Sequence, residues 1–326
     1  ALGQSKLVTR PLAGVMHIFI YLGFILINLE ILEIVFDGIF GTHRVLFSIL
    51  GAQAYYIFIG IFEVLALLVL VACVTFLIRR NIGNLKRFSG LEMTKWPRSD
   101  ANIILIVECL LMFAFLIMNA SDSVLMIAPE RLLSAFGHEH YMGFDFGNWF
   151  WVSAYLTGFM PNNVEYLFAI ERFCWWFHIT GVFAFSVYIL YSKHLHIFLA
   201  FPNTFYSKLS PKGEFNNLAS VKKEVEMMMN PSADPYAAPA EGVATEPQKF
   251  GAQDVTDLSW KQLMDSYSCT ECGRCTSECP ANQTGKLLSP RKIMMDTRDR
   301  LEELGKLKRE KGADAVDEKH LLGDYI

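Results

Sequence analysis

The apolar residues of this chain gather in long runs within its first two hundred positions. Four runs, at about 11–36, 54–78, 101–127 and 167–191, are rich in Phe, Ile, Leu and Val. About 20 apolar residues in a helix cross the ~30 Å hydrocarbon layer of a membrane, so each run predicts a transmembrane helix. A fifth apolar stretch, 146–160, is shorter and broken by glycine. It fits either an interfacial or re-entrant helix, with Trp149 and Trp151 at the headgroup boundary, or a buried amphipathic lid.

Beyond position 200 the pattern becomes polar, and three regions are expected. Residues 1–200 form a transmembrane helix bundle, and 201–255 form a linker rich in Pro and Ala. Residues 256–326 form a helical domain, in which Asp257 or Ser259 caps a short helix and Ser289 caps a longer one. The predicted fold is therefore all-α, a polytopic bundle followed by a helical ferredoxin-like domain.

Charge is distributed unevenly along the chain. The 326 residues are 52% hydrophobic and 19% charged, and the net charge of −4 averages two unlike halves. Nothing in this composition indicates a nucleic-acid partner. The loop 79–98 holds six Lys and Arg residues, which places it in the cytoplasm by the positive-inside rule, together with everything after Lys193. The chain begins with Ala1 and shows no signal peptide, so residues missing from the N-terminus are expected.

Four of the seven cysteines lie in the run SCTECGRCTSECPANQTG. Cys269, Cys272, Cys275 and Cys279-Pro280 have the spacing C-x₂-C-x₂-C-x₃-C-P, which is typical of iron–sulfur ligation. The first three thiolates are expected to hold one [4Fe–4S] cluster and Cys279 to ligate a second. Zinc is the weaker alternative, because it favours two separated C-x₂-C pairs. Disulfides are disfavoured in the cytoplasm.

The second cluster needs ligands that these 326 residues do not contain. We therefore expect the polypeptide to continue past Ile326 into a second cysteine motif, or a partner subunit to supply the missing ligands.

Histidines near the ends of the first and last predicted spans suggest haem. His17 and His43 bracket the first span, and His178 and His196 bracket the last. At 100° per residue, the eighteen residues between His178 and His196 return to the same face of one helix. If the two spans are antiparallel, His17 lies level with His196 and His43 with His178, and the two pairs can ligate one or two b-type haems.

Substitutes exist for two of these ligands. His194 is the substitute for His196, and His138 and His140 are the substitutes for His43. Taken alone, a histidine at a helix end is more often an interfacial hydrogen-bonder than a ligand. Polar residues within the spans receive no individual role, although some could carry protons to or from a quinone; they are Glu30, Glu33, Glu63, Glu108, Asn119 and Asp122. Three lone cysteines are interpreted as packing residues: Cys73, Cys109 and Cys174.

Two resemblances follow from these motifs. The histidine arrangement resembles the membrane cytochrome b subunit of respiratory nitrate reductase, in which two haems lie between antiparallel helices of a five-helix bundle. The resemblance implies a further helix ahead of the four spans seen here. The segment WKQLMDSYSCTECGRCTSECP resembles the helical two-cluster ferredoxin modules of heterodisulfide-reductase-like subunits.

The combination is similar to bacterial membrane-bound iron–sulfur oxidoreductases. It implies a multi-pass subunit of the bacterial inner membrane, of the respiratory quinone-oxidoreductase type, with the iron–sulfur domain in the cytoplasm. Electrons would pass between the quinone pool and a cytoplasmic partner, such as electron-transfer flavoprotein or a cysteine-rich heterodisulfide-reductase-like subunit. Two alternatives remain, a membrane-anchored iron–sulfur redox sensor and a structural anchor with zinc and no haem.

Overall fold

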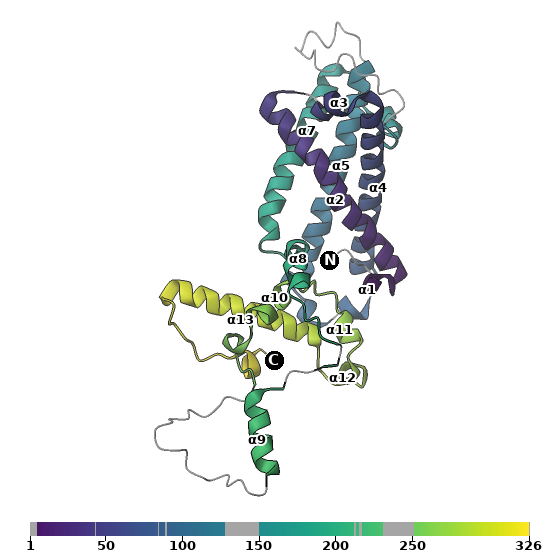
Figure 1. The fold of residues 1–326 in the computed structure, drawn as a ribbon. Helices are drawn as coiled ribbons and strands as arrows, with labels where there is room; N and C mark the ends of the chain where they lie inside the picture. Colours follow the sequence, from purple (N-terminus) through teal and green to yellow (C-terminus); the bar gives the residue numbers. More distant parts are fainter. Residues whose placement is uncertain are drawn as a thin grey trace. The chain divides into compact units, whose positions relative to one another are not determined.

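The computed structural model describes residues 5–42, 44–83, 85–88, 90–127, 150–211, 213–214, 217–230 and 251–325 (Figure 1). Every regular element in these ranges is helical. The chain divides into a membrane unit, Ala1–His194, and a C-terminal unit, Leu195–Ile326.

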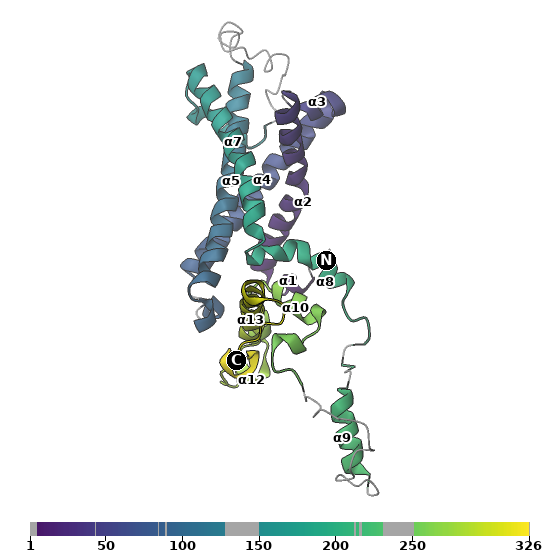
Figure 2. The same cartoon turned by 90° about the vertical axis from the view of Figure 1, so that its left-hand side faces the viewer.

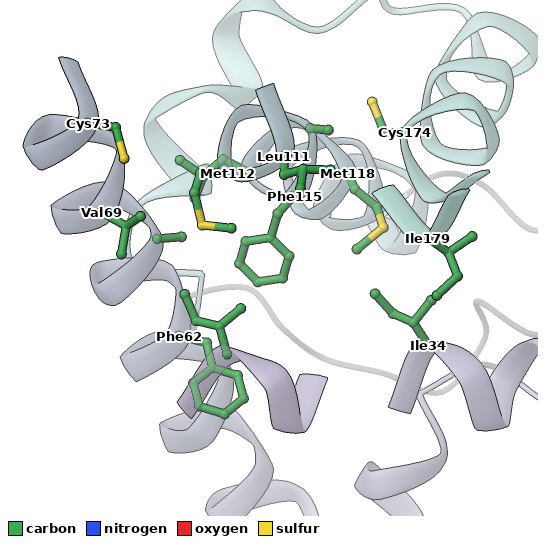
Figure 3. Close-up of a cluster of buried hydrophobic side chains, with 14 residues drawn as sticks. Ile34, Phe62, Val69, Cys73, Leu111, Met112, Phe115, Met118, Cys174 and Ile179 are labelled. Carbon is green, nitrogen blue, oxygen red and sulfur yellow. The ribbon is translucent and has the colours of Figure 1, made fainter. Parts of the chain in front are cut away.

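In the described residues, the membrane unit has four long α-helices and two short ones. They are α1 (Ser5–Val8), α2 (Pro11–Phe40), α3 (Val45–Leu50), α4 (Ala52–Asn81), α5 (Trp96–Ile127) and α7 (Val164–Ile189). Helix α4 packs between α2 and α5, and α5 also packs on α7. Figure 2 shows these four helices running side by side along the bundle. Their shared core holds Phe62, Val69, Phe115 and Ile179 among its buried side chains (Figure 3).

Three of the predicted membrane spans are confirmed as helices long and apolar enough to cross a bilayer, namely α2, α4 and α5. The fourth is not one unbroken span. Helix α7 passes the same criterion only together with the following helical stretch Lys193–Phe205, and the two are separated by a break. The described residues therefore provide three to four candidate spans.

Asp100, near the start of α5, explains why α7 does not resume at Lys193. Its carboxylate accepts hydrogen bonds from the hydroxyls of Tyr188 (2.6 Å) and Ser192 (2.7 Å) and from the backbone N–H of Lys193 (3.1 Å). The N–H of Lys193 therefore bonds to a side chain instead of to a carbonyl of the preceding turn. After Ile189 the N–H groups of the next three residues bond to carbonyls three residues back. Asp100 accepts the N–H that follows, which keeps the α-helix from resuming at Lys193.

The described part of the apolar stretch 146–160 consists of two 3₁₀ turns, Ser153–Tyr155 and Thr157–Phe159. Trp151 of this segment packs on α4 at Gly60, where an added Cβ would lie 2.7 Å from the indole ring. Phe150 and Ser153 are buried. The predicted helix is therefore absent from residues 150–160, and Trp149 lies outside the described residues.

The C-terminal unit is assembled from short helices around one longer helix. They are α8 (His196–Phe205), α9 (Ala219–Met229), α10 (Trp260–Tyr267), α11 (Arg274–Ser277), α12 (Pro280–Gln283), α13 (Pro290–Lys311) and α14 (Leu321–Asp324). Helix α10 packs on both α8 and α13, and α11 packs on α13.

Of the predicted helix caps in this unit, Ser259 and Ser289 are confirmed, whereas the alternative Asp257 lies in the 3₁₀ turn before α10. The Ser259 side chain caps α10 by accepting from the N–H of Gln262, and Ser289 caps α13 by accepting from the N–H of Lys292. These caps fix the two helix starts on either side of the cysteine motif.

Candidate functional site

The four clustered cysteines lie on a loop between α10 and α13. Cys269 comes two residues after the end of α10, and Cys275 lies in the short helix α11. Cys272 lies between two residues with left-handed backbone, Glu271 (φ 54°) and Gly273 (φ 71°). Glycine adopts this conformation without strain, whereas glutamate does so only when its surroundings hold it there. The two left-handed residues reverse the chain on either side of Cys272.

Arg298 of α13 holds Glu271 in this conformation. Its Nη2 donates to Glu271 Oε1 at 2.9 Å, and both side chains are largely buried. The backbone N–H of Glu271 then points at Cys269, with 3.4 Å between the nitrogen and Sγ. Helix α13 thus positions an N–H donor toward the first cysteine of the motif.

The second cysteine receives a charged donor. The Nε of Arg274 donates to Cys272 Sγ across 3.2 Å. Burial alone would raise the pKa of the Cys272 thiol, but the backbone N–H and the guanidinium of Arg274 stabilise the thiolate and bring the pKa below its ordinary value. For Cys269, burial dominates and raises the pKa despite the N–H of Glu271. The loop is therefore already arranged to carry negative charge on Cys272.

The donor set fits an iron–sulfur cluster. Four thiols, N–H donors and a guanidinium directed at sulfur are the groups that hold and tune such clusters. Cys279 is the N-cap residue of α12, and Pro280 occupies the first helical position, so the C-P pair begins a new helix. Within the described ranges, no three His, Cys, Asp or Glu side chains lie in an arrangement that could hold a metal ion. The fit rests on the donor chemistry and the loop.

His178 is the best placed of the predicted haem ligands. It is buried on α7, and its Nδ1 lies 3.1 Å from the carbonyl oxygen of Leu111 on α5. Because a carbonyl can only accept, Nδ1 carries the proton and Nε2 keeps its lone pair. A backbone carbonyl fixing the tautomer in this way is the usual outer-shell partner of a metal-binding histidine.

The prediction that His178 and His196 lie on the same face of one continuous helix is wrong. Helix α7 ends at Ile189, and His196 begins α8 in the other unit. His17 lies half-buried on α2 in the membrane unit, and the two units are not placed relative to one another, so the pairing of His17 with His196 stays a prediction.

The remaining histidine predictions are also open. His43, His138 and His140 lie outside the described residues, so the pairing of His43 with His178 stays a prediction as well. His194, the substitute for His196, is in the membrane unit, with its ring 5.5 Å from that of Phe185.

Two charged residues of the membrane unit were missed by the sequence patterns. Asp100 keeps α7 from resuming at Lys193, as described above. Arg44 is buried and donates to Asn119 (2.7 Å) and Asp122 (2.6 Å) of α5. The sequence could have indicated Arg44, because it is the one Lys or Arg residue of the loop 37–53, which lies between two long apolar runs.

Comparison with known proteins agrees with the cysteine site. The family described as "4Fe-4S binding domain" matches residues 260–281. The chain is 26% identical over 304 residues to "Probable iron-sulfur-binding oxidoreductase FadF" of Bacillus subtilis, covering 93% of this chain and 36% of that protein. It is 28% identical over 298 residues to "EtfAB:quinone oxidoreductase" of Syntrophomonas wolfei, covering 88% of this chain and 35% of that protein.

A shorter similarity covers the C-terminal region. It is 39% identity over 47 residues to "Probable membrane-anchored ferredoxin" of Chromohalobacter salexigens, or 14% of this chain and 7% of that protein. The chain spans about a third of the length of the first two relatives. No solved structure matches the chain at a significant level.

Proposed function

We propose that this chain is the membrane electron-transfer part of an iron–sulfur quinone oxidoreductase. Cys269, Cys272 and Cys275 hold a [4Fe–4S] cluster, and Cys279 binds a second cluster whose other ligands come from outside these 326 residues. The observation that carries the proposal is the loop at Cys272, where Arg274 directs its guanidinium at a thiol of lowered pKa. A bound cluster supplies one-electron chemistry.

The chain's own residues prepare this site. Arg274 and the N–H of Glu271 donate to sulfur, which favours the thiolates that metal binding requires. Arg298 keeps Glu271 in its left-handed conformation and places a second guanidinium beside the loop. Donors to sulfur stabilise negative charge there, which is the means by which a protein adjusts cluster potential.

The membrane unit is proposed to bind b-type haem, which adds a second one-electron carrier when bound. His178 is one axial ligand, because its Nδ1–H bond to Leu111 leaves Nε2 available. His43 is its proposed partner, and His17 with His196 forms the second pair. The resemblance to nitrate reductase cytochrome b supports this assignment.

The partners follow from orientation and similarity. Six basic residues in the loop 79–98 support a cytoplasmic location for that loop and for the C-terminal unit, in a bacterial inner membrane. The printed name of the Syntrophomonas wolfei relative supports electron-transfer flavoprotein as the cytoplasmic donor and quinone as the acceptor. A cysteine-rich heterodisulfide-reductase-like subunit is the second candidate partner.

Spectroscopy of the purified protein tests this proposal. We expect brown absorbance that bleaches with dithionite, sharp bands of reduced b-type haem, and iron in excess of zinc. Cys272→Ser should lose the bleaching component and the iron of the cluster, whereas the matched control Cys174→Ser, a buried cysteine of the membrane core, should keep both. A colourless protein that contains zinc would refute the electron-transfer function.

A further inference from the structure

A group of ionisable side chains lies buried where α2 and α5 end and α4 begins. It consists of Arg44, from the connection between α2 and α3, with Glu30 and Glu33 of α2, Tyr55 of α4 and Asp122 of α5. We call these five residues the Arg44 cluster. Each of them is at most 5% exposed. Charged groups at such depth in a membrane protein are costly and mark functional sites by default, and the proposed function uses none of these.

The guanidinium of Arg44 contacts Asp122 more closely than it contacts Glu30. Its Nη2 lies 2.6 Å from Asp122 Oδ2, a short charge-assisted hydrogen bond. Its Nη1 donates to the Tyr55 hydroxyl at 3.2 Å and lies 3.6 Å from Glu30 Oε1. The ion pair with Asp122 is therefore tight, while the contact with Glu30 is longer than a hydrogen bond.

The carboxylate of Glu33 is more fully hydrogen-bonded than that of Glu30. Its Oε2 accepts from the Tyr55 hydroxyl at 3.0 Å, and its Oε1 accepts from the N–H of Leu46 at 2.9 Å. For Glu30, the second oxygen, Oε2, is buried and has no hydrogen-bond partner among the described residues. A buried carboxylate oxygen without a donor carries the full penalty of desolvation, which protonation relieves.

The charges of the cluster do not balance. Glu30, Glu33 and Asp122 face one guanidinium, which stays charged at every relevant pH. If all three carboxyls were ionised, two negative charges would remain uncompensated in a low-dielectric interior. Glu30 and Glu33 are also three positions apart on one helix face, where like charges repel. Binding of one proton by this pair raises the net charge of the cluster from minus two to minus one.

The helices packed around the cluster do not supply the missing positive charge. On α2, the carboxylate of Asp37 adds a negative charge and accepts from the N–H groups of Arg44 and Val45. On α4, Glu63 adds another and accepts from Asn119 Nδ2 and the N–H of Val152.

Among the described residues, the remaining neighbouring elements bring no further cation to the cluster either. On α7, Glu171 is paired with the adjacent Arg172, and α3 has no ionisable side chain. Phe150, after the α5 end, places an uncharged ring 5.6 Å from the Arg44 guanidinium.

We propose that Glu30 and Glu33 form a proton-exchange site, which holds one shared proton at neutral pH and binds a second when the membrane unit accepts an electron. The electron would pass from the reduced iron–sulfur cluster to the haem proposed for the membrane unit, and one proton from the aqueous phase would enter with it, so that the net charge of the unit is conserved. Only the coupling to electrons rests on the proposed function. The shared proton follows from the charge and geometry of the cluster.

Infrared spectroscopy of the full-length protein in detergent tests the site. The oxidised protein should show the C=O band of a protonated carboxyl, shifted downward in D₂O, and reduction by dithionite should increase it. Glu30→Gln should remove this contribution in both states. Glu63→Gln is the matched control, because Glu63 is equally buried but accepts from Asn119, Val152 and Ser153, so the band should persist.

The outcomes separate this inference from the proposed function. If the carboxyl band is absent, or survives in either Glu30→Gln or Glu33→Gln, the proton site is refuted. If the protein reduces quinone but the carboxyl band does not change on reduction, the coupling of proton binding to electron transfer is refuted and the proposed function stands. If the band responds to the variants but no electrons reach quinone, the proposed function fails and the proton site stands. The wild-type spectra need no substitution, so they remain decisive where a variant does not fold.

Discussion

Arg300 of α13 joins three segments of the C-terminal unit. Only 1% exposed, it donates to both carboxylate oxygens of Asp254 at 3.0 and 2.8 Å. It donates likewise to both oxygens of Asp317 at 2.9 and 2.7 Å, and to the carbonyl of Lys319 at 2.6 Å. Asp254 also accepts from the N–H of Leu321 at 3.1 Å. The chain before α10 and the chain after α13 are therefore both held by one guanidinium.

We expect Arg300→Met to destabilise this unit strongly. Methionine fills much of the space but leaves Asp254 buried without its cation, and breaking such a buried pair costs about 3–5 kcal/mol. The Asp317 side chain is 24% exposed, so water replaces part of its lost interaction. The lower end, about 3 kcal/mol, is therefore expected. At about 1.4 kcal/mol per factor of ten, this is roughly a hundredfold loss of protection from hydrogen exchange.

The same interaction predicts acid sensitivity. The Arg300 hydrogen bonds, opposed by burial, hold the pKa of Asp254 below its ordinary value. A carboxyl whose pKa is lower in the folded state stabilises fully above the pKa of the unfolded chain, about 3.9, and this stabilisation is lost as the pH falls further. The wild-type unit should therefore lose protection below about pH 4, and Arg300→Met should lose this part of the pH dependence.

Hydrogen-exchange mass spectrometry measures this effect in the full chain, through peptides from residues 251–325. Arg309→Met is the matched control, because Arg309 is exposed on the same helix and should change protection little. If Arg300→Met and Arg309→Met reduce protection equally, Arg300 does not hold the unit together and the reasoning from its five hydrogen bonds is refuted.

Three further predictions concern single side chains. Asp100→Asn replaces the carboxylate that accepts from the Lys193 N–H by an amide, and should lower the stability of the membrane unit by about 1–3 kcal/mol. Thermal unfolding in detergent measures this effect, and an unchanged midpoint would contradict the role of Asp100. Arg274→Met should raise the pKa of the Cys272 thiol, so that alkylation of the metal-free protein requires higher pH than in wild type. His178→Leu should lower the haem content of the purified protein, whereas His320→Leu, in the charged tail, should leave it unchanged.

The sequence predicted those parts of the chain that are determined by local chemistry. Ser259 and Ser289 mark the starts of α10 and α13 because a cap needs only its own first turn. The thiol spacing predicted the cysteine loop, but not that Arg298 would fix Glu271, since this contact joins residues 27 positions apart.

The failed prediction, one helix from His178 to His196, shows what periodicity leaves out. Residues 178–196 are compatible with a continuous helix, and no proline or glycine pair stops it after Ile189. Asp100 keeps the helix from resuming at Lys193; it lies more than 90 positions away and becomes a neighbour of Lys193 only when α5 and α7 pack together. Tertiary contacts of this kind override local propensity without leaving a local signal.

The buried carboxylates near the two ends of α5 differ in how fully their oxygens are hydrogen-bonded. Near its start, both oxygens of Asp100 are bonded to donors, and the ammonium group of Lys193 lies 3.9 Å away. Near its other end, Asp122 takes the strongest bond of Arg44 and leaves Glu30 with an unbonded oxygen. A buried carboxylate whose oxygens are all bonded to donors is not stabilised further by protonation, whereas one with an unbonded oxygen is. Stability should therefore respond most to changes at Asp100, and proton binding to changes at Glu30.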